Sequence, residues 1–161
     1  MTGTNTILLV EDDRNDILLI ERAFRQANLV NVSLQIVTDG DAAVFYLNGQ
    51  GEYSDRQRYP LPVVMLLDLK LPRRSGHEVL AWLRQQPEIK RLPVIILTSS
   101  RENTDVNWAY DLGANSYLVK PIGLAALVEV AKSLKMYWLL LNQPPVVQPN
   151  YSSPADAPGA V

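Results

Sequence analysis

The sequence predicts an α/β fold in which a doubly wound, five-stranded parallel sheet carries five helices on its two faces. Short apolar runs alternate along the 161-residue chain with segments whose apolar residues recur at helical spacing. The central run, Val63–Leu67, has five apolar residues without a polar break, which is typical of a strand buried on both faces of a parallel sheet. Strands and helices in alternation require right-handed crossovers, so the helices divide between the two faces.

Each predicted strand is a short apolar run that ends at polar or turn-forming residues. The second run alternates only weakly between apolar and polar positions, and the others are nearly continuous. We expect the five strands at Ile7–Val10, Ser33–Val37, Val63–Leu67, Val94–Leu97 and Ser116–Val119.

The predicted helices lie between these runs, where apolar residues recur three or four positions apart. We expect them at Arg14–Asn28, Ala42–Leu47, His77–Gln85, Thr104–Leu112 and Leu124–Leu141. Asp41 follows a turn and is expected to cap the second helix, and Gly113 is expected to end the fourth. The last helix is the longest, and its expected core stripe runs from Leu124 to Leu141.

Two segments are expected to lack regular structure. Residues Asn48–Pro62 are a polar stretch that we expect to form an extended loop before the central strand. Residues Asn142–Val161 contain five prolines and one charged residue, a composition typical of an extended or disordered tail. We therefore expect residues 1–141 to form one domain and residues 142–161 a proline-rich C-terminal tail.

The composition excludes several classes of function. The net charge of −2 gives no general attraction to nucleic acid or to anionic membranes. The chain has no cysteine, and therefore neither a disulfide framework nor a thiolate metal site. The first residues lack the basic region of a signal peptide, and no apolar run reaches the roughly 18 residues of a membrane span. We expect a cytoplasmic protein.

Polar residues of distinct chemistry stand where four of the predicted strands end. Glu11 and Asp12 follow the first strand, Asp68 the third, Thr98 the fourth and Lys120 the fifth. The carboxyl ends of parallel strands share one edge of the sheet, so these side chains are expected to converge. Clustered carboxylates repel one another unless a cation neutralises them, and hard oxygen ligands suit Mg²⁺. The set describes a pocket for a phosphoryl group, with Asp68 as nucleophile.

His77 is the single histidine of the chain. It stands beside Glu78 near a predicted helix start, and no second histidine is present to share a metal ion. We expect it to be a surface polar residue.

Four segments, LLVEDD, MLLDLKLPRRSG, VIILTSS and YLVKP, resemble the receiver domain of two-component response regulators. The resemblance covers Thr6–Leu141. It implies a CheY-like, flavodoxin-like fold with strand order 2-1-3-4-5 and a Mg²⁺ cofactor. It also implies a phosphoacceptor rather than an enzyme, a protein that catalyses at most its own phosphotransfer and dephosphorylation.

The resemblance further implies a role for each residue that matches a receiver motif. Asp68 is expected to accept the phosphoryl group with the help of Lys120 and Thr98, and Thr98 and Tyr117 are the expected switch residues. The expected metal ligands are Glu11, Asp12, Asp68 and the backbone carbonyl of Lys70. A shift by one residue would make Asp12 and Asp13 the acid pair, although Glu11 directly follows the strand. The Lys120–Pro121 bond is expected to be cis.

A narrower resemblance is to the cyanobacterial single-domain response regulators that are paired with phytochrome histidine kinases. It is carried by the segments LPRRSGHEVL, PEIKRLPVIILTSS and MYWLLLNQPP. It implies a histidine kinase of the phytochrome type as partner. The twenty residues after Leu141 are too few for a helix-turn-helix module, so we expect no DNA binding and an output through protein contact.

Three other functions are weighed against this one. A haloacid-dehalogenase-like phosphatase needs a second aspartate two positions after its nucleophile, where this chain has Lys70. A flavodoxin-like electron carrier needs a hydroxyl-rich phosphate loop, whereas the acids after the first strand would repel phosphate. A phosphorylation-independent interaction domain stays open as an alternative.

Apolar residues beyond the core stripe predict a homodimer through the fourth helix, fifth strand and fifth helix. Val106 and Tyr110 stand four residues apart and share one helix face. An exposed apolar strip of this kind usually marks a partner site. The alternatives are ordinary scattered surface residues or a docking patch for the kinase or target. The expected interface residues are Val106, Tyr110, Tyr117, Val130 and Tyr137.

Overall fold

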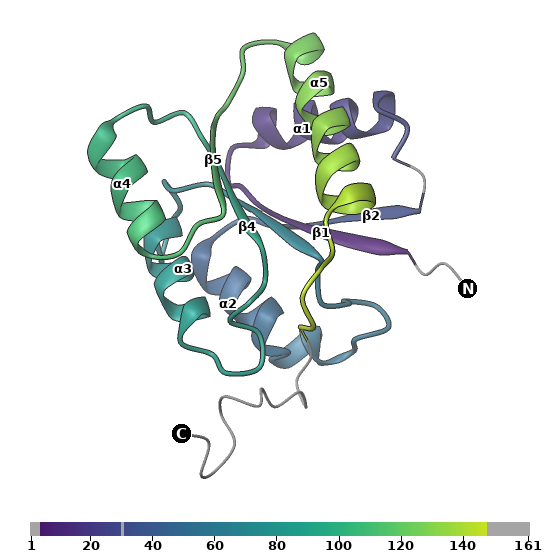
Figure 1. The fold of residues 1–161 in the computed structure, drawn as a ribbon. Helices are drawn as coiled ribbons and strands as arrows, with labels where there is room; N and C mark the ends of the chain where they lie inside the picture. Colours follow the sequence, from purple (N-terminus) through teal and green to yellow (C-terminus); the bar gives the residue numbers. More distant parts are fainter. Residues whose placement is uncertain (1–3, 30, 148–161) are drawn as a thin grey trace.

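The computed structural model describes residues 4–29 and 31–147. Its five parallel strands form one sheet in the order β2-β1-β3-β4-β5, which confirms the predicted fold (Figure 1). The strands are β1 (Asn5–Val10), β2 (Val32–Val37), β3 (Val64–Leu67), β4 (Val94–Thr98) and β5 (Ser116–Val119). The α-helices are α1 (Arg14–Gln26), α2 (Gly40–Asn48), α3 (Gly76–Arg84), α4 (Asn103–Asp111) and α5 (Leu124–Leu134). A short 3₁₀-helix, Gly51–Ser54, interrupts the stretch that was expected to be an extended loop. No helix of the described part is long and apolar enough to cross a membrane.

The helices form two layers, α1 and α5 on one face of the sheet and α2, α3 and α4 on the other (Figure 1). Alternation along β1 shows why both faces are apolar: Ile7 packs under α1 and α5, while Leu8 packs under the opposite layer. All four residues of β3 are buried, as expected of a central strand covered on both sides.

The start of α2 differs from the prediction, because Asp39 and not Asp41 caps this helix. Asp39 has an extended backbone, and its Oδ1 atom accepts a hydrogen bond from the Ala42 N–H at 2.7 Å. Gly40 is already helical and lies so close to Arg74 that an added Cβ would stand 1.9 Å from the Arg74 carbonyl oxygen. The predicted end of α4 is confirmed, since Gly113 follows it with φ +101°.

The long last helix changes its winding after Leu134. Residues Lys135–Leu141 form a π-helical segment, in which each hydrogen bond spans one residue more than in an α-helix. The wider turn brings Leu139 against the core on the α1 and α5 face, while Leu141 is 69% exposed. The expected core position at Leu141 is therefore wrong. The predicted tail is described only to Val147, and its remaining residues lie outside the described part.

Candidate functional site

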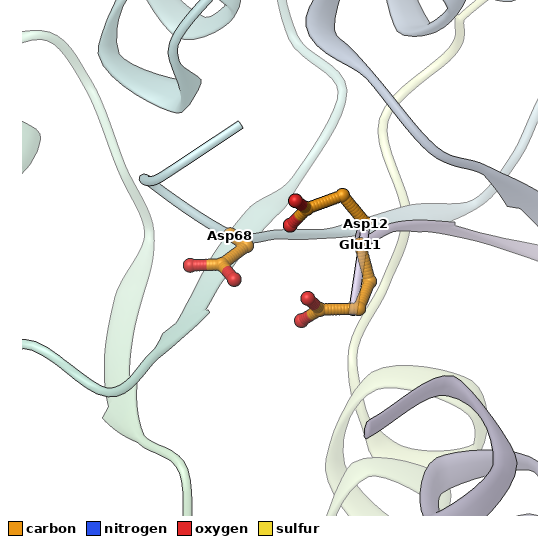
Figure 2. A group of neighbouring side chains, drawn as sticks. All are labelled: Glu11, Asp12 and Asp68. Carbon is orange, nitrogen blue, oxygen red and sulfur yellow. The ribbon is translucent and has the colours of Figure 1, made fainter. Parts of the chain in front are cut away.

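Three carboxylates meet at the carboxyl edge of the sheet, where β1 and β3 end. Figure 2 shows the side chains of Glu11, Asp12 and Asp68 gathered there, and each offers an oxygen within 4.8 Å of the others. The backbone ladder continues one residue past each strand and fixes this position: the Glu11 N–H binds the Val37 carbonyl, and the Asp68 N–H binds the Val10 carbonyl, both at 3.1 Å. We call Glu11, Asp12 and Asp68 the acid trio.

Asp68 is 6% exposed, and both of its carboxylate oxygens have partners. Oδ1 accepts a hydrogen bond from the Leu69 N–H at 2.7 Å, and Oδ2 lies 2.9 Å from the Lys120 ammonium. The start of α3 packs directly against this residue, because a Cβ at Gly76 would stand 2.1 Å from the Asp68 carbonyl oxygen. These contacts hold the carboxylate in one orientation at the end of the central strand.

Lys120 carries the positive charge of the site. Its Nζ atom lies 2.6 Å from Glu11, 2.8 Å from Asp16 and 2.9 Å from Asp68, and its side chain is only 13% exposed. Burial alone would lower the pKa of Lys120, but the three carboxylates outweigh burial and raise it. The expected cis bond is wrong: no peptide of the described residues is cis, in line with the intrinsic preference for trans.

Glu11 is the most deeply buried acid of the trio. Burial raises the pKa of Glu11 to about 7, although the nearby Lys120 ammonium and the hydrogen bond from the Asp13 N–H act against this rise. Among the described residues, its Oε2 atom is buried without a hydrogen bond of good geometry, so the ion pair with Lys120 is its compensation. A further cation at this edge would therefore meet carboxylates that are incompletely balanced.

A cleft of about 220 Å³ opens at this edge, and both the buried Thr98 and the exposed Lys70 line it. The full lining is Glu11, Asp12, Asp13, Asp16, Asp68, Lys70, Thr98, Ser99 and Lys120. Carboxylate oxygens at short mutual distance are the donor set that hard divalent cations take. The chemistry of the acid trio therefore fits a divalent cation such as Mg²⁺.

Asp13 and Asp16 lie just outside the acid trio, at the N-cap and in the first turn of α1. Asp13 caps this helix, because its side chain accepts a hydrogen bond from the Asp16 N–H at 2.9 Å. It is exposed and does not belong to the trio, so the structure places Glu11 and not Asp13 beside Asp12 and Asp68. Our sequence analysis missed Asp16, whose signal was an acid in the first turn of the helix that follows the acidic run.

Tyr117 connects β5 to the loop that follows Thr98. Its hydroxyl donates to the Ser100 carbonyl oxygen at 3.0 Å, and the Ser100 hydroxyl donates to Asp105 of α4 at 2.6 Å. Burial raises the pKa of Tyr117. The side chain is half-buried, and Ser100 connects it to both the loop after Thr98 and α4.

The expectation that His77 is a surface residue is wrong. Its side chain is buried and stacks on the ring of Trp108, with centroids 4.0 Å apart and planes 15° from parallel. Its Nε2 atom lies 3.3 Å from the Asp105 carbonyl oxygen. The pattern around His77 could not show this, because the covering ring belongs to α4, thirty-one residues further along the chain.

The expected interface residues lie on α4, β5 and the end of the last helix, with unequal exposure. Tyr110 is 49% exposed and Tyr137 is 55% exposed. Val106 and Tyr117 are half-buried, and Val130 packs partly against the core. Trp108, 53% exposed on α4, adds an apolar side chain that the sequence analysis did not include.

The doubly wound sheet, the acid trio and the lysine at its carboxyl edge define the class of signal receiver domains. The family described as response regulator receiver domain matches residues 7–132, and the chain belongs to this family. It is 40% identical to the response regulator Rcp1 of Synechocystis sp., over 83% of this chain and 88% of that protein.

Solved structures agree with this assignment. The phosphorylated cyanobacterial phytochrome response regulator RcpA superimposes with a TM-score of 0.81 at 38% identity, over 89% of this chain and 99% of that one. The Mn²⁺-bound form of Rcp1 gives 0.77 at 38% identity, over 88% and 99%. These likenesses confirm the resemblance to phytochrome response regulators.

Proposed function

We propose that this chain accepts a phosphoryl group on Asp68 from a histidine kinase in a two-component phosphorelay. The observation that carries the proposal is the placement of the Asp68 carboxylate, beside Glu11 and Asp12 and 2.9 Å from the Lys120 ammonium. In the transfer, an Asp68 oxygen attacks the phosphorus of a phosphohistidine, the N–P bond breaks, and the imidazole leaves as an O–P bond forms. The chain is then a phosphoacceptor that catalyses no reaction except its own phosphotransfer and dephosphorylation.

Each residue around Asp68 has a part in this transfer. The Leu69 N–H holds one carboxylate oxygen and so orients the nucleophile. Lys120 provides a positive charge for the phosphoryl oxygens, and Thr98, which lines the same cleft, would donate its hydroxyl to one of them. After transfer, that bond draws the loop containing Ser100 inward, which removes the acceptor of the Tyr117 hydroxyl and lets the ring turn.

Mg²⁺ would be held by Glu11, Asp12, Asp68 and the backbone carbonyl of Lys70. Bound there, the ion supplies positive charge that neutralises the carboxylates and the transferring phosphoryl group. The donor set of the acid trio supports this part of the proposal, as does the Mn²⁺-bound form of the related Rcp1.

The proposed partner is a histidine kinase of the phytochrome type. The support is the similarity to RcpA, which is a cyanobacterial phytochrome response regulator. Such a kinase takes its phosphoryl group from ATP inside the cell, so the proposal places the chain in the cytoplasm. We propose that its output is a protein contact and not DNA binding.

We also propose a homodimer through α4, β5 and α5. Tyr110 and Tyr137 are both about half exposed, and a hollow of about 830 Å³ between β5 and the last helix is lined by Val130 and Tyr137. Sizing at micromolar concentration, of wild type against Tyr110→Glu combined with Tyr137→Glu, tests this. We expect a dimer for the wild type and a monomer for the variant. If both proteins are monomeric, with and without phosphate, the proposal is wrong.

The phosphotransfer itself is tested by incubating the chain with a phytochrome-type histidine kinase, ATP and Mg²⁺, followed by mapping of the phosphate by mass. We expect one phosphoryl group on Asp68, none on Asp68→Asn, and none after chelation of the metal. A variant that still accepts phosphate would refute the assignment of Asp68. A wild type that accepts none, from the kinase or from acetyl phosphate, would favour the phosphorylation-independent interaction domain.

A further inference from the structure

The partners of Lys120 are of two kinds. Its ammonium contacts Glu11 and Asp68, which belong to the acid trio, and Asp16, which does not. The Asp16 carboxylate lies 2.8 Å from the Nζ atom of Lys120, although these two residues stand 104 positions apart in the sequence. This contact is as short as the one between Lys120 and Asp68. One positive charge is thus shared among three carboxylates, and one of the three lies beyond the place where a cation would bind.

A divalent cation at the acid trio would compete with Lys120. It would take Glu11 and Asp68, and its two positive charges would repel the ammonium that now holds them. The backbone of Lys120 is tied to β4 through the bond from its N–H to the Thr98 carbonyl at 2.7 Å, so only the side-chain end can move away. Asp16 is the partner that stays available to the ammonium after such a move.

The position of Asp16 is set independently of Lys120. Its N–H is bound by the capping side chain of Asp13, and the first turn of a helix is a favourable place for a negative charge. Asp16 is therefore held at a fixed distance from the trio. Its side chain is 34% exposed, so the carboxylate can take the ammonium without burying an unpaired charge.

We propose that Asp16 is a positioning residue that receives Lys120 when a divalent cation occupies the acid trio, and thereby raises the affinity of the site for that cation. The inference rests on the proposed cation site and deepens it. An ordinary first-turn acid would also favour a nearby cation through its charge, but that effect would not depend on Lys120. The dependence on Lys120 is what separates the two roles.

The test measures Mn²⁺ affinity from the electron paramagnetic resonance signal of the free ion, a readout that needs no phosphotransfer. Asp16→Asn is expected to weaken Mn²⁺ binding roughly fivefold, the upper range for a partly exposed ion pair. Asp16→Glu is expected to restore most of the loss. Asp13→Ser is the matched control, because it removes a carboxylate from the same helix turn while keeping a capping oxygen.

A double-mutant cycle with Lys120→Met decides the mechanism. In that background, Asp16→Asn is expected to cost no more affinity than Asp13→Ser. An equal loss with and without Lys120, or a loss in the wild-type background no larger than that of Asp13→Ser, would overturn the proposal. A wild type that binds no Mn²⁺ would overturn it together with the cation site, whereas Mn²⁺ binding without phosphotransfer would refute the proposed function alone.

Discussion

The two ends of the sheet both hold charged side chains that are buried or half-buried, but they pair these charges in opposite ways. At the carboxyl end, one ammonium is shared by the carboxylates of Glu11, Asp16 and Asp68. At the amino end, the guanidinium of Arg84 donates to the carbonyl oxygens of Lys90, Leu92 and Gly113 at 2.7 to 3.0 Å.

A second arginine at the amino end repeats this arrangement. Arg56 donates to the carbonyl oxygens of Tyr46 and Leu47 at the end of α2, at 2.7 and 2.9 Å, and to that of Tyr59 at 3.2 Å. Burial lowers the pKa of both Arg56 and Arg84, yet each guanidinium stays charged, since its ordinary pKa is far above neutrality.

The difference teaches which buried charges carry function. The carbonyl oxygens around Arg84 and Arg56 are neutral and cannot bind a competing cation strongly. They accept hydrogen bonds from the N–H donors of each guanidinium group, so these two sites hold loops in place. The carboxyl end has more negative than positive charge, and that excess is relieved only when a cation or a phosphoryl group with its cation arrives. Imbalance, and not burial, distinguishes the functional end.

The largest expected effect is at the carboxyl end. Asp68→Asn should reduce phosphorylation by acetyl phosphate below detection, because the amide is no nucleophile. The melting temperature should stay within about 3 °C, roughly 1 kcal/mol for a domain of this size, because the amide oxygen still accepts the Leu69 N–H and one repelling charge is lost. Mass analysis and thermal unfolding check both; a larger fall in melting temperature would show that this carboxylate is structural.

The next largest expected effect is at the amino end of the sheet, where a substitution should change stability and leave phosphorylation unchanged. Arg84→Ala should lower the free energy of unfolding by about 3 kcal/mol, since several carbonyl oxygens lose a charged donor. Arg84→Lys keeps the charge but not the planar fork, and should lose part of this stability. Denaturant unfolding measures both. Phosphorylation of the folded Arg84→Ala protein should proceed at the wild-type rate, and a slower rate would mean that the two ends are coupled.

Thr98→Ala should separate phosphorylation from its consequence. The variant should still be phosphorylated, but the lost bond to a charged oxygen, worth roughly 1.5–3 kcal/mol, should weaken the structural response. Hydrogen exchange in the loop around Ser100, before and after phosphorylation, measures that response. Thr98→Ser is the control because it keeps the hydroxyl, and an unchanged response in Thr98→Ala would count against the switch role.

The smallest expected effect concerns Tyr46, a buried tyrosine at the amino end. Its hydroxyl donates to the Pro60 carbonyl at 2.7 Å, so Tyr46→Phe should cost about 1 kcal/mol at neutral pH. Burial raises the pKa of Tyr46 to about 12, from 10 in the unfolded chain. Its contribution is therefore complete below pH 10 and is lost as the pH rises towards 12. Between pH 9 and 11, the free energy of unfolding should decrease less steeply with pH for Tyr46→Phe than for the wild type. Equal slopes for the two proteins would contradict the raised pKa of Tyr46.

Much of the site could be predicted because its residues directly follow strands. Asp68 directly follows an apolar run that is typical of a buried strand, and parallel strands bring Glu11 and Lys120 to the same edge. The residues that cap the helices were harder to predict from the sequence. Asp39 and Asp41 are equivalent by residue type, and only the structure shows that Asp39 accepts the hydrogen bond from the Ala42 N–H.

By itself, the sequence determined the order of strands and helices and the chemistry of the strand ends, because apolar periodicity and residue type are local properties. Only the tertiary structure decided the pairing of Lys120 with Asp16 and the stacking of His77 on Trp108. The same holds for the hydrogen bonds from Arg84 to two carbonyl oxygens that lie just before β4 and β5. Each of these contacts joins different helices, strands or loops. Which side chains meet there depends on how the layers pack in three dimensions, which no local pattern records.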